Sequence, residues 1–206
     1  VENNGTYGLT KGQFSATNDL ESKNKYGEDN LFPPIDLTSM AIQMGASYVA
    51  RSFSGDRDQL VPLIMGAIQH KGFALLDIIS PCVTFNNHES STKSYDYIRN
   101  HNEAMGKTDF VPLGEEIKTS YKDGSSVEVK LHDGSRLSLE KTDHNFDPTD
   151  AGKSLDLIRR KNEEGKIITG LLYVDNKCKP LTEIMDLPDK PLNSLEQDEL
   201  CPGSEI

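Results

Sequence analysis

The sequence predicts an α/β fold, in which a parallel sheet is flanked by helices and a C-terminal extension adds a β-hairpin and a helix. Two observations predict it. Between residues 35 and 80, segments of helical and strand periodicity alternate with short connections, which is the pattern of a parallel sheet. Beyond residue 111, two strictly alternating segments flank an Asp-Gly pair, a strong hairpin signal. We therefore expect a first part over residues 1–110 and an extension over residues 111–206.

The first elements follow from caps and periodicity. Residues 3–34 are rich in Gly, Asn, Ser and Lys and predict a long loop with little regular structure, which in a compact domain is usually functional or disordered. A helix capped by Asp36 is expected over residues 37–44, because a glycine follows it directly. A short strand follows over residues 48–53.

The next two elements complete the core of the predicted sheet. Ser54 or Asp56 can cap a second helix, whose leucines and isoleucines recur at helical spacing until Gly72 ends it. Residues 73–79 are then almost continuously apolar, which suits a central strand covered on both faces.

The second half of the chain predicts further elements of both kinds. In chain order we expect a short helix over 95–107, paired strands over 127–131 and 136–140, a helix over 150–164, and a strand over 167–174. From residue 176 onward, four prolines indicate an extended tail.

Composition excludes several classes of protein. The 206 residues are enough for one sizeable domain, and 22 Lys+Arg against 33 Asp+Glu give a net charge of −11. This acidic balance argues against nucleic-acid binding, which needs basic side chains to neutralise phosphates. No apolar run reaches the roughly 18 residues of a membrane span, so we expect no membrane partner. Three cysteines without a CxxC pair favour a reducing compartment, and we expect a cytoplasmic protein.

The chain begins at Val1 without a basic segment followed by an apolar one, so we expect no signal peptide here. Residues 1–4 have the character of the end of a strand. We therefore expect the chain to be part of a longer polypeptide.

Cys82 has a setting that favours a ligand role. It lies just past the carboxyl end of the apolar strand 73–79, and ligands of open α/β sheets gather at that edge. The alternative is a buried thiol at a strand end. Cys178 and Cys201 lie in the polar tail, and we interpret both as incidental.

The segment over residues 3–13 is the second candidate site. Its three glycines let the backbone approach a ligand closely, and Asn4 with the freed carbonyls offers hard oxygen donors suited to Mg²⁺ on a diphosphate. Lys11 adds a point charge suited to a carboxylate or phosphate. The segment has neither Walker nor Rossmann glycine spacing, and an ordinary polar loop is the alternative.

The same segment, Asn-Asn-Gly-Thr-Tyr-Gly-Leu-Thr-Lys-Gly-Gln, resembles the end of the thiamine-diphosphate motif in β subunits of 2-oxoacid:ferredoxin oxidoreductases, the 2-oxoglutarate enzymes in particular. Residues 79–86, 147–150 and 169–174 resemble further parts of that subunit, in the same order. The resemblance implies a partial thiamine-diphosphate-binding fold, with residues 1–110 as the C-terminal part of the cofactor domain.

The resemblance also implies roles for individual residues. The side-chain oxygen of Asn4 and the backbone carbonyl of Thr6 would be ligands of Mg²⁺, and the backbone at Gly8 and Leu9 would contact the diphosphate of thiamine diphosphate. Cys82 would be one of the four ligands of a [4Fe–4S] cluster.

The implied activity is the oxidative decarboxylation of a 2-oxoacid to an acyl-CoA, with electrons passed through the cluster to ferredoxin. The implied partners are the α subunit, ferredoxin, coenzyme A and the 2-oxoacid. Lys11 would pair with the distal carboxylate of 2-oxoglutarate, whereas pyruvate-type members often have a smaller residue there. The family's Gly-Asp-Gly and the other three cluster cysteines are absent from this chain. We therefore expect the C-terminal portion of the subunit, inactive alone and binding neither cofactor tightly.

Three alternatives remain open. The chain could serve a pyruvate-type or broad-range enzyme, or a thiamine-diphosphate enzyme without iron–sulfur chemistry. It could also be a non-catalytic interaction module whose hairpin region, residues 116–145, docks a partner subunit, since an exposed hairpin needs packing to be stable. The five histidines have no spacing that predicts a role in catalysis, and we expect surface or structural positions for them.

Overall fold

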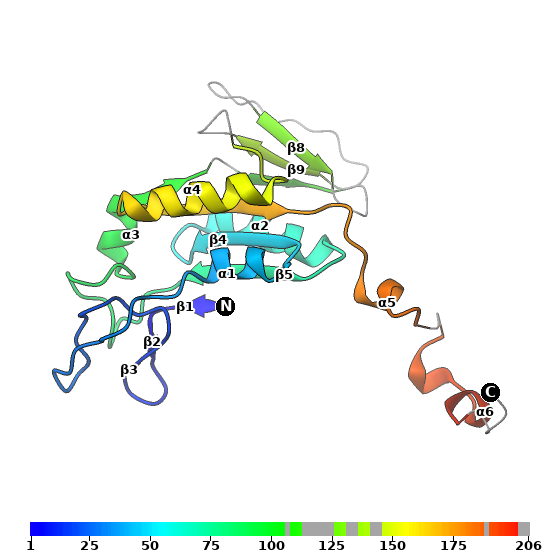
Figure 1. Cartoon of the computed structure of the whole chain (residues 1–206), viewed down its shortest axis with the longest axis horizontal. Helices are drawn as coiled ribbons and strands as arrows, with labels where there is room; N and C mark the ends of the chain where they lie inside the picture. The colour runs from blue at the N-terminus through cyan, green and yellow to red at the C-terminus, as the bar shows by residue number, and fades with distance from the viewer. Residues whose placement is uncertain (106–107, 113–125, 131–135, 141–145, 188–189, 202–206) are drawn as a thin grey trace.

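A computed structural model describes residues 1–105, 108–112, 126–130, 136–140, 146–187 and 190–201 of the chain. Its central sheet has five strands in the order β1-β5-β4-β10-β6 (Figure 1). In chain order these strands are β1 (Glu2–Asn3), β4 (Tyr48–Phe53), β5 (Ala74–Ile79), β6 (Asn102–Ala104) and β10 (Ile167–Val174).

The sheet is mostly parallel, which confirms the predicted α/β class. β1, β5 and β4 run parallel to one another, and β6 runs parallel to β10. The exception is β10, which lies antiparallel to β4, where a parallel sheet was predicted. A helical crossover joins β4 to β5 and fixes their common direction, but no such crossover joins β4 to β10. The predicted boundary at residue 110 stays a prediction, although β10 joins the sheet formed by the first part of the chain.

Four longer helices begin at side-chain caps. In chain order they are α1 (Leu37–Gln43), α2 (Arg57–Gln69), α3 (Tyr95–His101) and α4 (Ala151–Glu163). Asp36 caps α1 by accepting from the Ser39 amide at 2.7 Å, as predicted, and Asp56 rather than Ser54 caps α2. The helix predicted over 95–107 is shorter, because residues 102–104 pair with β10 as an edge strand. Periodicity in so short a segment does not show where a helix gives way to a strand.

The helices cover both faces of the sheet and build two hydrophobic clusters. On one face α1 and α4 pack against inward side chains such as Val49, Ile168 and Leu172. On the other face α2 packs against Tyr48 and Leu171. Because β4 and β10 are covered on both faces, nearly all of their residues are buried, and most of these residues are apolar.

A second sheet follows α3 in the chain and contains the predicted hairpin. Strands β7 (Thr108–Val111), β8 (Ser126–Lys130) and β9 (Arg136–Glu140) are antiparallel, in the order β7-β9-β8. The pairing of Val127 with Leu139 confirms the hairpin, while its Asp-Gly turn at residues 133–134 lies outside the described residues.

The C-terminal segment leaves the body of the molecule (Figure 1). Where an extended tail was predicted, it contains three short helices, α5 (Leu181–Ile184), η1 (Leu192–Ser194) and α6 (Gln197–Leu200). Pro180 and Pro191 stand at helix N-caps, where proline's missing N–H costs nothing. The prolines therefore mark helix starts in addition to extended chain.

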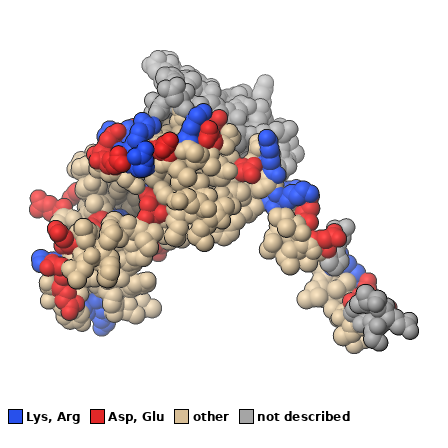
Figure 2. All heavy atoms as spheres, viewed as in Figure 1, with Lys and Arg blue, Asp and Glu red and all other residues tan. Residues whose placement is uncertain are grey.

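Charged side chains of both signs alternate over α4 (Figure 2). Arg159 pairs with Asp156 and Glu163, and Lys161 pairs with Glu164. Among the described helices, none has the length and apolarity that crossing a membrane requires.

Candidate functional site

The two predicted motifs meet at the carboxyl edge of the parallel strands. β1 and β5 are neighbours with Asn3 beside Ile79, and the Ser80 amide donates to the Asn3 carbonyl at 2.9 Å. The segment that begins at Asn4 and the segment that contains Cys82 therefore leave the sheet side by side. This is the edge where open α/β sheets bind their ligands.

The first motif folds into a small hairpin. Strands β2 (Thr6–Tyr7) and β3 (Gln13–Phe14) pair antiparallel, and residues 8–12 form the tip. The Gly12 amide closes the tip by donating to the Tyr7 carbonyl at 2.8 Å. Strands of two residues give no periodicity signal, so a loop with little regular structure was predicted here.

Three residues of this hairpin adopt the left-handed backbone conformation. Gly5 has φ of 72° and Gly12 has φ of 96°, values that glycine adopts without steric cost. Lys11 has φ of 75°, which is rare for a residue with a side chain. Such outliers cluster at functional sites, because the surrounding structure must hold them in place. The conformation of Lys11 therefore favours a function for the tip.

Asn4 and Thr6 offer oxygen donors close together. The Asn4 Oδ1 accepts from the Thr6 amide at 3.1 Å, which brings the two residues into one tight turn. Thr6 is buried, and its hydroxyl donates to the Gln13 carbonyl at 2.9 Å, which fixes the start of the hairpin. An amide oxygen and a backbone carbonyl are hard donors that suit Mg²⁺.

The tip of the hairpin contacts the second motif. A Cβ placed on Gly8 would lie 3.8 Å from the Cys82 Sγ, so the backbone at residue 8 passes directly beside the thiol. Cys82 is half-buried, whereas Leu9 at the tip is 97% exposed. The structure thus brings together the predicted diphosphate-binding backbone and the predicted cluster ligand.

The other two cysteines lie elsewhere. Cys178 sits at the opposite edge of the sheet, 3.5 Å from the His70 Nε2, and Cys201 is exposed in the tail. Within the part of the chain that the structure describes, no three His, Cys, Asp or Glu side chains form a group that could hold a metal. The described residues therefore fit a magnesium site through two neutral oxygens, and they offer an iron–sulfur cluster one thiolate.

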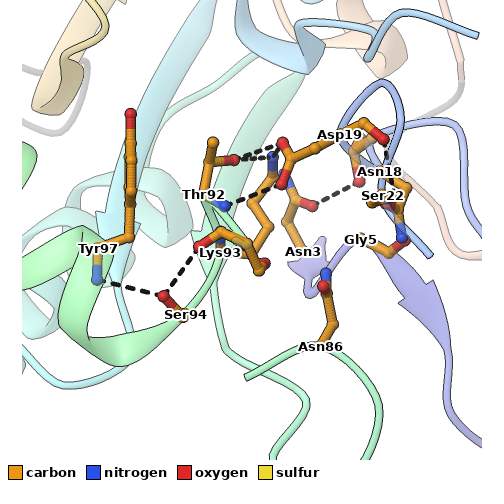
Figure 3. A network of polar contacts seen from close by, with 12 residues as sticks. Asn3, Gly5, Asn18, Asp19, Ser22, Asn86, Thr92, Lys93, Ser94 and Tyr97 are labelled. Carbon is orange, nitrogen blue, oxygen red and sulfur yellow. Dashed lines mark hydrogen bonds and ion pairs between the residues drawn. The ribbon is translucent and has the colours of Figure 1, made fainter. Parts of the chain in front are cut away.

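Sequence reasoning missed the buried polar network beneath this site (Figure 3). Asn86 donates from Nδ2 to the Asn4 carbonyl at 2.7 Å, and Asn18 donates from Nδ2 to the Gly5 carbonyl at 2.5 Å. Asn86 is 2% and Asn18 4% exposed. Asparagine is usually a surface residue, so the sequence alone predicted no structural role for either of them.

Asp19 fastens the long loop to the segment that follows Cys82. Its carboxylate accepts from the Thr92 amide at 2.8 Å and pairs with Lys93 at 3.0 Å, and both charged side chains are largely buried. The 3–34 loop is thus held by the segment that follows the second motif, as Figure 3 shows.

A polar cavity of about 410 Å³ opens at the same edge of the sheet but does not include the predicted ligands. The predicted site residues lie outside its lining, which instead includes the linked side chains Asn3, Asp77, Arg51 and Asp36. Asp77 accepts from Asn3 at 2.9 Å and from Arg51 at 2.8 Å, and Arg51 also pairs with Asp36 at 3.0 Å. These charges already satisfy one another, so we interpret the cavity as a structural junction between β1, β4 and β5.

The charges at this junction shift the ionisation of Asp36. Burial is the largest single influence and raises the pKa of this carboxyl, but the charge of Arg51 and the hydrogen bonds from Ser39, Thr38 and Arg51 together outweigh it. The pKa of Asp36 is consequently held well below its ordinary value of 3.8. The Arg51 guanidinium remains charged, because its two carboxylate neighbours raise its pKa against the effect of burial.

Comparison with known proteins agrees with this geometry. Residues 1–78 match the family described as thiamine pyrophosphate enzyme, C-terminal TPP binding domain. Over 96 residues the chain is 43% identical to a 2-oxoacid:ferredoxin oxidoreductase subunit beta of Saccharolobus solfataricus, covering 46% of this chain and 31% of that subunit. The predicted resemblance to β subunits of the 2-oxoacid:ferredoxin oxidoreductases is thereby confirmed.

Two 2-oxoglutarate enzymes are also similar to the chain, each over part of its own length. A 2-oxoglutarate synthase subunit KorB of Archaeoglobus fulgidus is 34% identical over 118 residues, which cover 56% of this chain and 42% of that subunit. A solved 2-oxoglutarate:ferredoxin oxidoreductase from Magnetococcus marinus, with 2-oxoglutarate, coenzyme A and succinyl-CoA bound, aligns with a TM-score of 0.63 and 26% identity. That alignment covers 90% of this chain and 49% of the other. The chain therefore spans less than half the length of these relatives.

Proposed function

We propose that this chain is the cofactor-binding portion of a β subunit that oxidatively decarboxylates a 2-oxoacid, 2-oxoglutarate in particular, to an acyl-CoA. The observation that carries the proposal is the contact between the glycine hairpin and Cys82 at the carboxyl edge of the sheet. The hairpin lies within the residues that match the TPP binding domain, and Cys82 follows four residues after that match ends.

The residues of the hairpin would hold thiamine diphosphate through Mg²⁺. The Asn4 Oδ1 and the Thr6 carbonyl are the proposed metal ligands, and the Gly8 and Leu9 backbone is the proposed contact of the diphosphate. When bound, thiamine diphosphate supplies the carbanion chemistry of decarboxylation, and Mg²⁺ neutralises the diphosphate. The role of the protein is to fix these groups at the sheet edge, and the turn closed by the Asn4 and Thr6 hydrogen bond supports that role.

Cys82 would provide one thiolate of a [4Fe–4S] cluster. The remaining ligands would come from outside this chain, since the described residues bring no second cysteine to the site. The short separation between Gly8 and the thiol supports this role, because electron transfer from the cofactor requires the cluster nearby. The proposed partners are the α subunit, ferredoxin and coenzyme A.

Lys11 would select the substrate. It is exposed at the hairpin tip in a left-handed conformation, so its ammonium group is available to a ligand. A cation there suits the distal carboxylate of 2-oxoglutarate. The names of two relatives as 2-oxoglutarate enzymes support this choice over the alternatives, a pyruvate-type or a broad-range enzyme.

The test uses the complete enzyme that contains this chain. N4A should raise the Mg²⁺ concentration needed for thiamine-diphosphate binding at least tenfold, and C82S should abolish the visible absorbance and low-temperature electron paramagnetic resonance signal of the cluster. N193A and C201S, in the exposed tail, are the matched controls and should change neither property.

Two outcomes would contradict the proposal in different ways. Unchanged cofactor binding and turnover in N4A would favour a non-catalytic interaction module. A full cluster signal and unchanged electron transfer in C82S would favour a thiamine-diphosphate enzyme without iron–sulfur chemistry. The chain alone should bind neither cofactor tightly and should be inactive, so a stoichiometric [4Fe–4S] cluster on the isolated chain would refute the proposed ligand set.

A further inference from the structure

Two successive backbone carbonyls of the hairpin are each held by a buried asparagine, and Figure 3 labels both asparagines and Gly5. Asn86 donates to the Asn4 carbonyl at 2.7 Å, and Asn18 donates to the Gly5 carbonyl at 2.5 Å. The two asparagines lie 82 and 13 residues away along the chain from the carbonyls that they hold. We call this pair, Asn18 and Asn86, the amide clamp.

The clamp leaves no room for a side chain between its arms. Gly5 has φ of 72°, and a Cβ there would lie 2.6 Å from the Asn86 Nδ2 and 3.4 Å from the Lys93 Cγ. Because the carbonyls of Asn4 and Gly5 are both engaged by the clamp, the candidate metal ligands are the Thr6 carbonyl and the Asn4 Oδ1, which keeps a second lone pair while it accepts from the Thr6 amide. This is the same pair that was proposed as magnesium ligands.

One arm of the clamp also belongs to the Cys82 turn. The backbone amide of Asn86 donates to the Cys82 carbonyl at 2.8 Å, so Asn86 contacts the two motifs through different atoms. The other arm is fixed independently. The Ser22 hydroxyl donates to the Asn18 Oδ1, and the Asn30 Nδ2 donates to the Asn18 carbonyl at 3.2 Å.

We propose that Asn86 is a positioning residue that holds the Asn4–Thr6 backbone and the Cys82 turn in one fixed arrangement. This inference rests on the proposed function, since it assigns a purpose to that arrangement. A buried carbonyl without a donor is costly, so loss of the Asn86 N–H would let the Asn4 peptide turn toward water. The proposed magnesium ligands and the Cys82 thiol would then no longer be held in a fixed position relative to one another.

The substitution N86D tests this inference because it keeps the shape of the side chain and removes the donor. N86A removes both the donor and the shape. The matched control is N87D, since the Asn87 Oδ1 only accepts, from the Tyr95 amide at 3.0 Å, and an aspartate can do the same. If N86D does not fold, N18D removes the donor of the other arm of the clamp, and the same measurements are made on N18D instead.

Three measurements report whether the Asn4–Thr6 backbone and Cys82 keep their positions. In the complete enzyme, the Mg²⁺ concentration for half-maximal thiamine-diphosphate binding should rise about tenfold in N86D and N86A, and should stay within twofold in N87D. In this chain, mass spectrometry should show Cys82 alkylated by iodoacetamide at least threefold faster in N86D. The amide hydrogens of Gly5 and Thr6 should exchange faster in N86D than in N87D.

The inference would be overturned if N86D and N87D had the same Mg²⁺ dependence and the same rate of Cys82 alkylation. This holds even if N86A is impaired, because the loss of side-chain packing alone would then explain the effect of N86A. The proposed function fails separately, when the unaltered enzyme binds thiamine diphosphate without Mg²⁺ or when N4A has no effect. For N18D, faster exchange of the Gly5 amide hydrogen and a higher Mg²⁺ concentration for half-maximal cofactor binding support the clamp. Values equal to those of N87D contradict it.

Discussion

Arg51 and Asp77 are direct register partners on the parallel strands β4 and β5, and the Arg51 Nε donates to the Asp77 carboxylate at 2.8 Å. Asp77 is fully buried, and its other oxygen accepts from Asn3 on β1. One carboxylate thus connects three neighbouring strands close to the edge of the sheet where the proposed site lies.

The first prediction concerns this pair. R51M should lower the free energy of unfolding by about 3–5 kcal/mol, because it leaves the Asp77 charge buried without its partner. The control K23M removes an exposed pair, Lys23 with Asp29, and should cost about 1 kcal/mol or less. Urea unfolding of both variants measures the difference. Equal costs would show that the buried pair contributes no more than a surface one.

A second prediction follows from the lowered pKa of Asp36. Such a carboxylate stabilises the fold at pH above its ordinary value of 3.8, and this stabilisation is lost as the pH falls through the lower pKa of the folded state. D36N should therefore be less stable than the natural chain at pH 7, and the gap should narrow below pH 3.8. Because asparagine also caps helices well, the substitution isolates the charge.

Urea unfolding at pH 7, 4 and 2.5 measures this gap. D150N is the matched control, since Asp150 also caps a helix but its side chain is 43% exposed and pairs with an exposed lysine. Its effect should stay within about 0.5 kcal/mol. A D36N gap that is independent of pH would show that the Arg51 contact does not stabilise the charged form of Asp36.

A third prediction separates backbone strain from steric conflict at Gly5. Gly5 and Gly45 both have positive φ, 72° and 87°, but a Cβ on Gly45 would meet nothing within 4 Å. G45A should cost only the strain of about 1–2 kcal/mol, whereas G5A should cost at least about 1 kcal/mol more, because it also displaces Asn86. Thermal and urea unfolding compare the two, and equal costs would contradict the close contact at Gly5.

Most of the central fold could be predicted from the sequence, because buried positions are occupied by apolar residues, whose spacing along the chain can be recognised. The apolar runs of β4, β5 and β10 and the capping residue Asp36 lie where the pattern indicates. The antiparallel direction of β10 could not be predicted, since an apolar strand reads the same in both directions. The hairpin at residues 6–14 was missed because its strands are too short to show alternation.

The candidate site shows the same division. Gly8 and Cys82 could be placed at one edge because each follows a strand of a parallel pair, and the structure brings them together. The clamp residues Asn18 and Asn86 could not be found this way. Their importance comes from burial and from partners far along the chain, and a polar residue in a loop carries no local signal of either.

The last prediction concerns Lys11, whose φ of 75° makes it a strained position in the hairpin tip. K11G should raise the free energy of unfolding of this chain by about 1 kcal/mol, because glycine adopts that conformation without strain. In the complete enzyme the same substitution should lower kcat/KM for 2-oxoglutarate about ten- to a hundredfold, because it removes a hydrogen bond from a charged group. It should lower kcat/KM for pyruvate less than about threefold. K25G, in the same long loop, is the control and should leave kcat/KM unchanged for both substrates. If K11G were more stable but lost activity equally toward both substrates, the proposed substrate would be wrong, and the similarity to the β subunits would be unaffected. Unchanged stability would show that Lys11 is not strained.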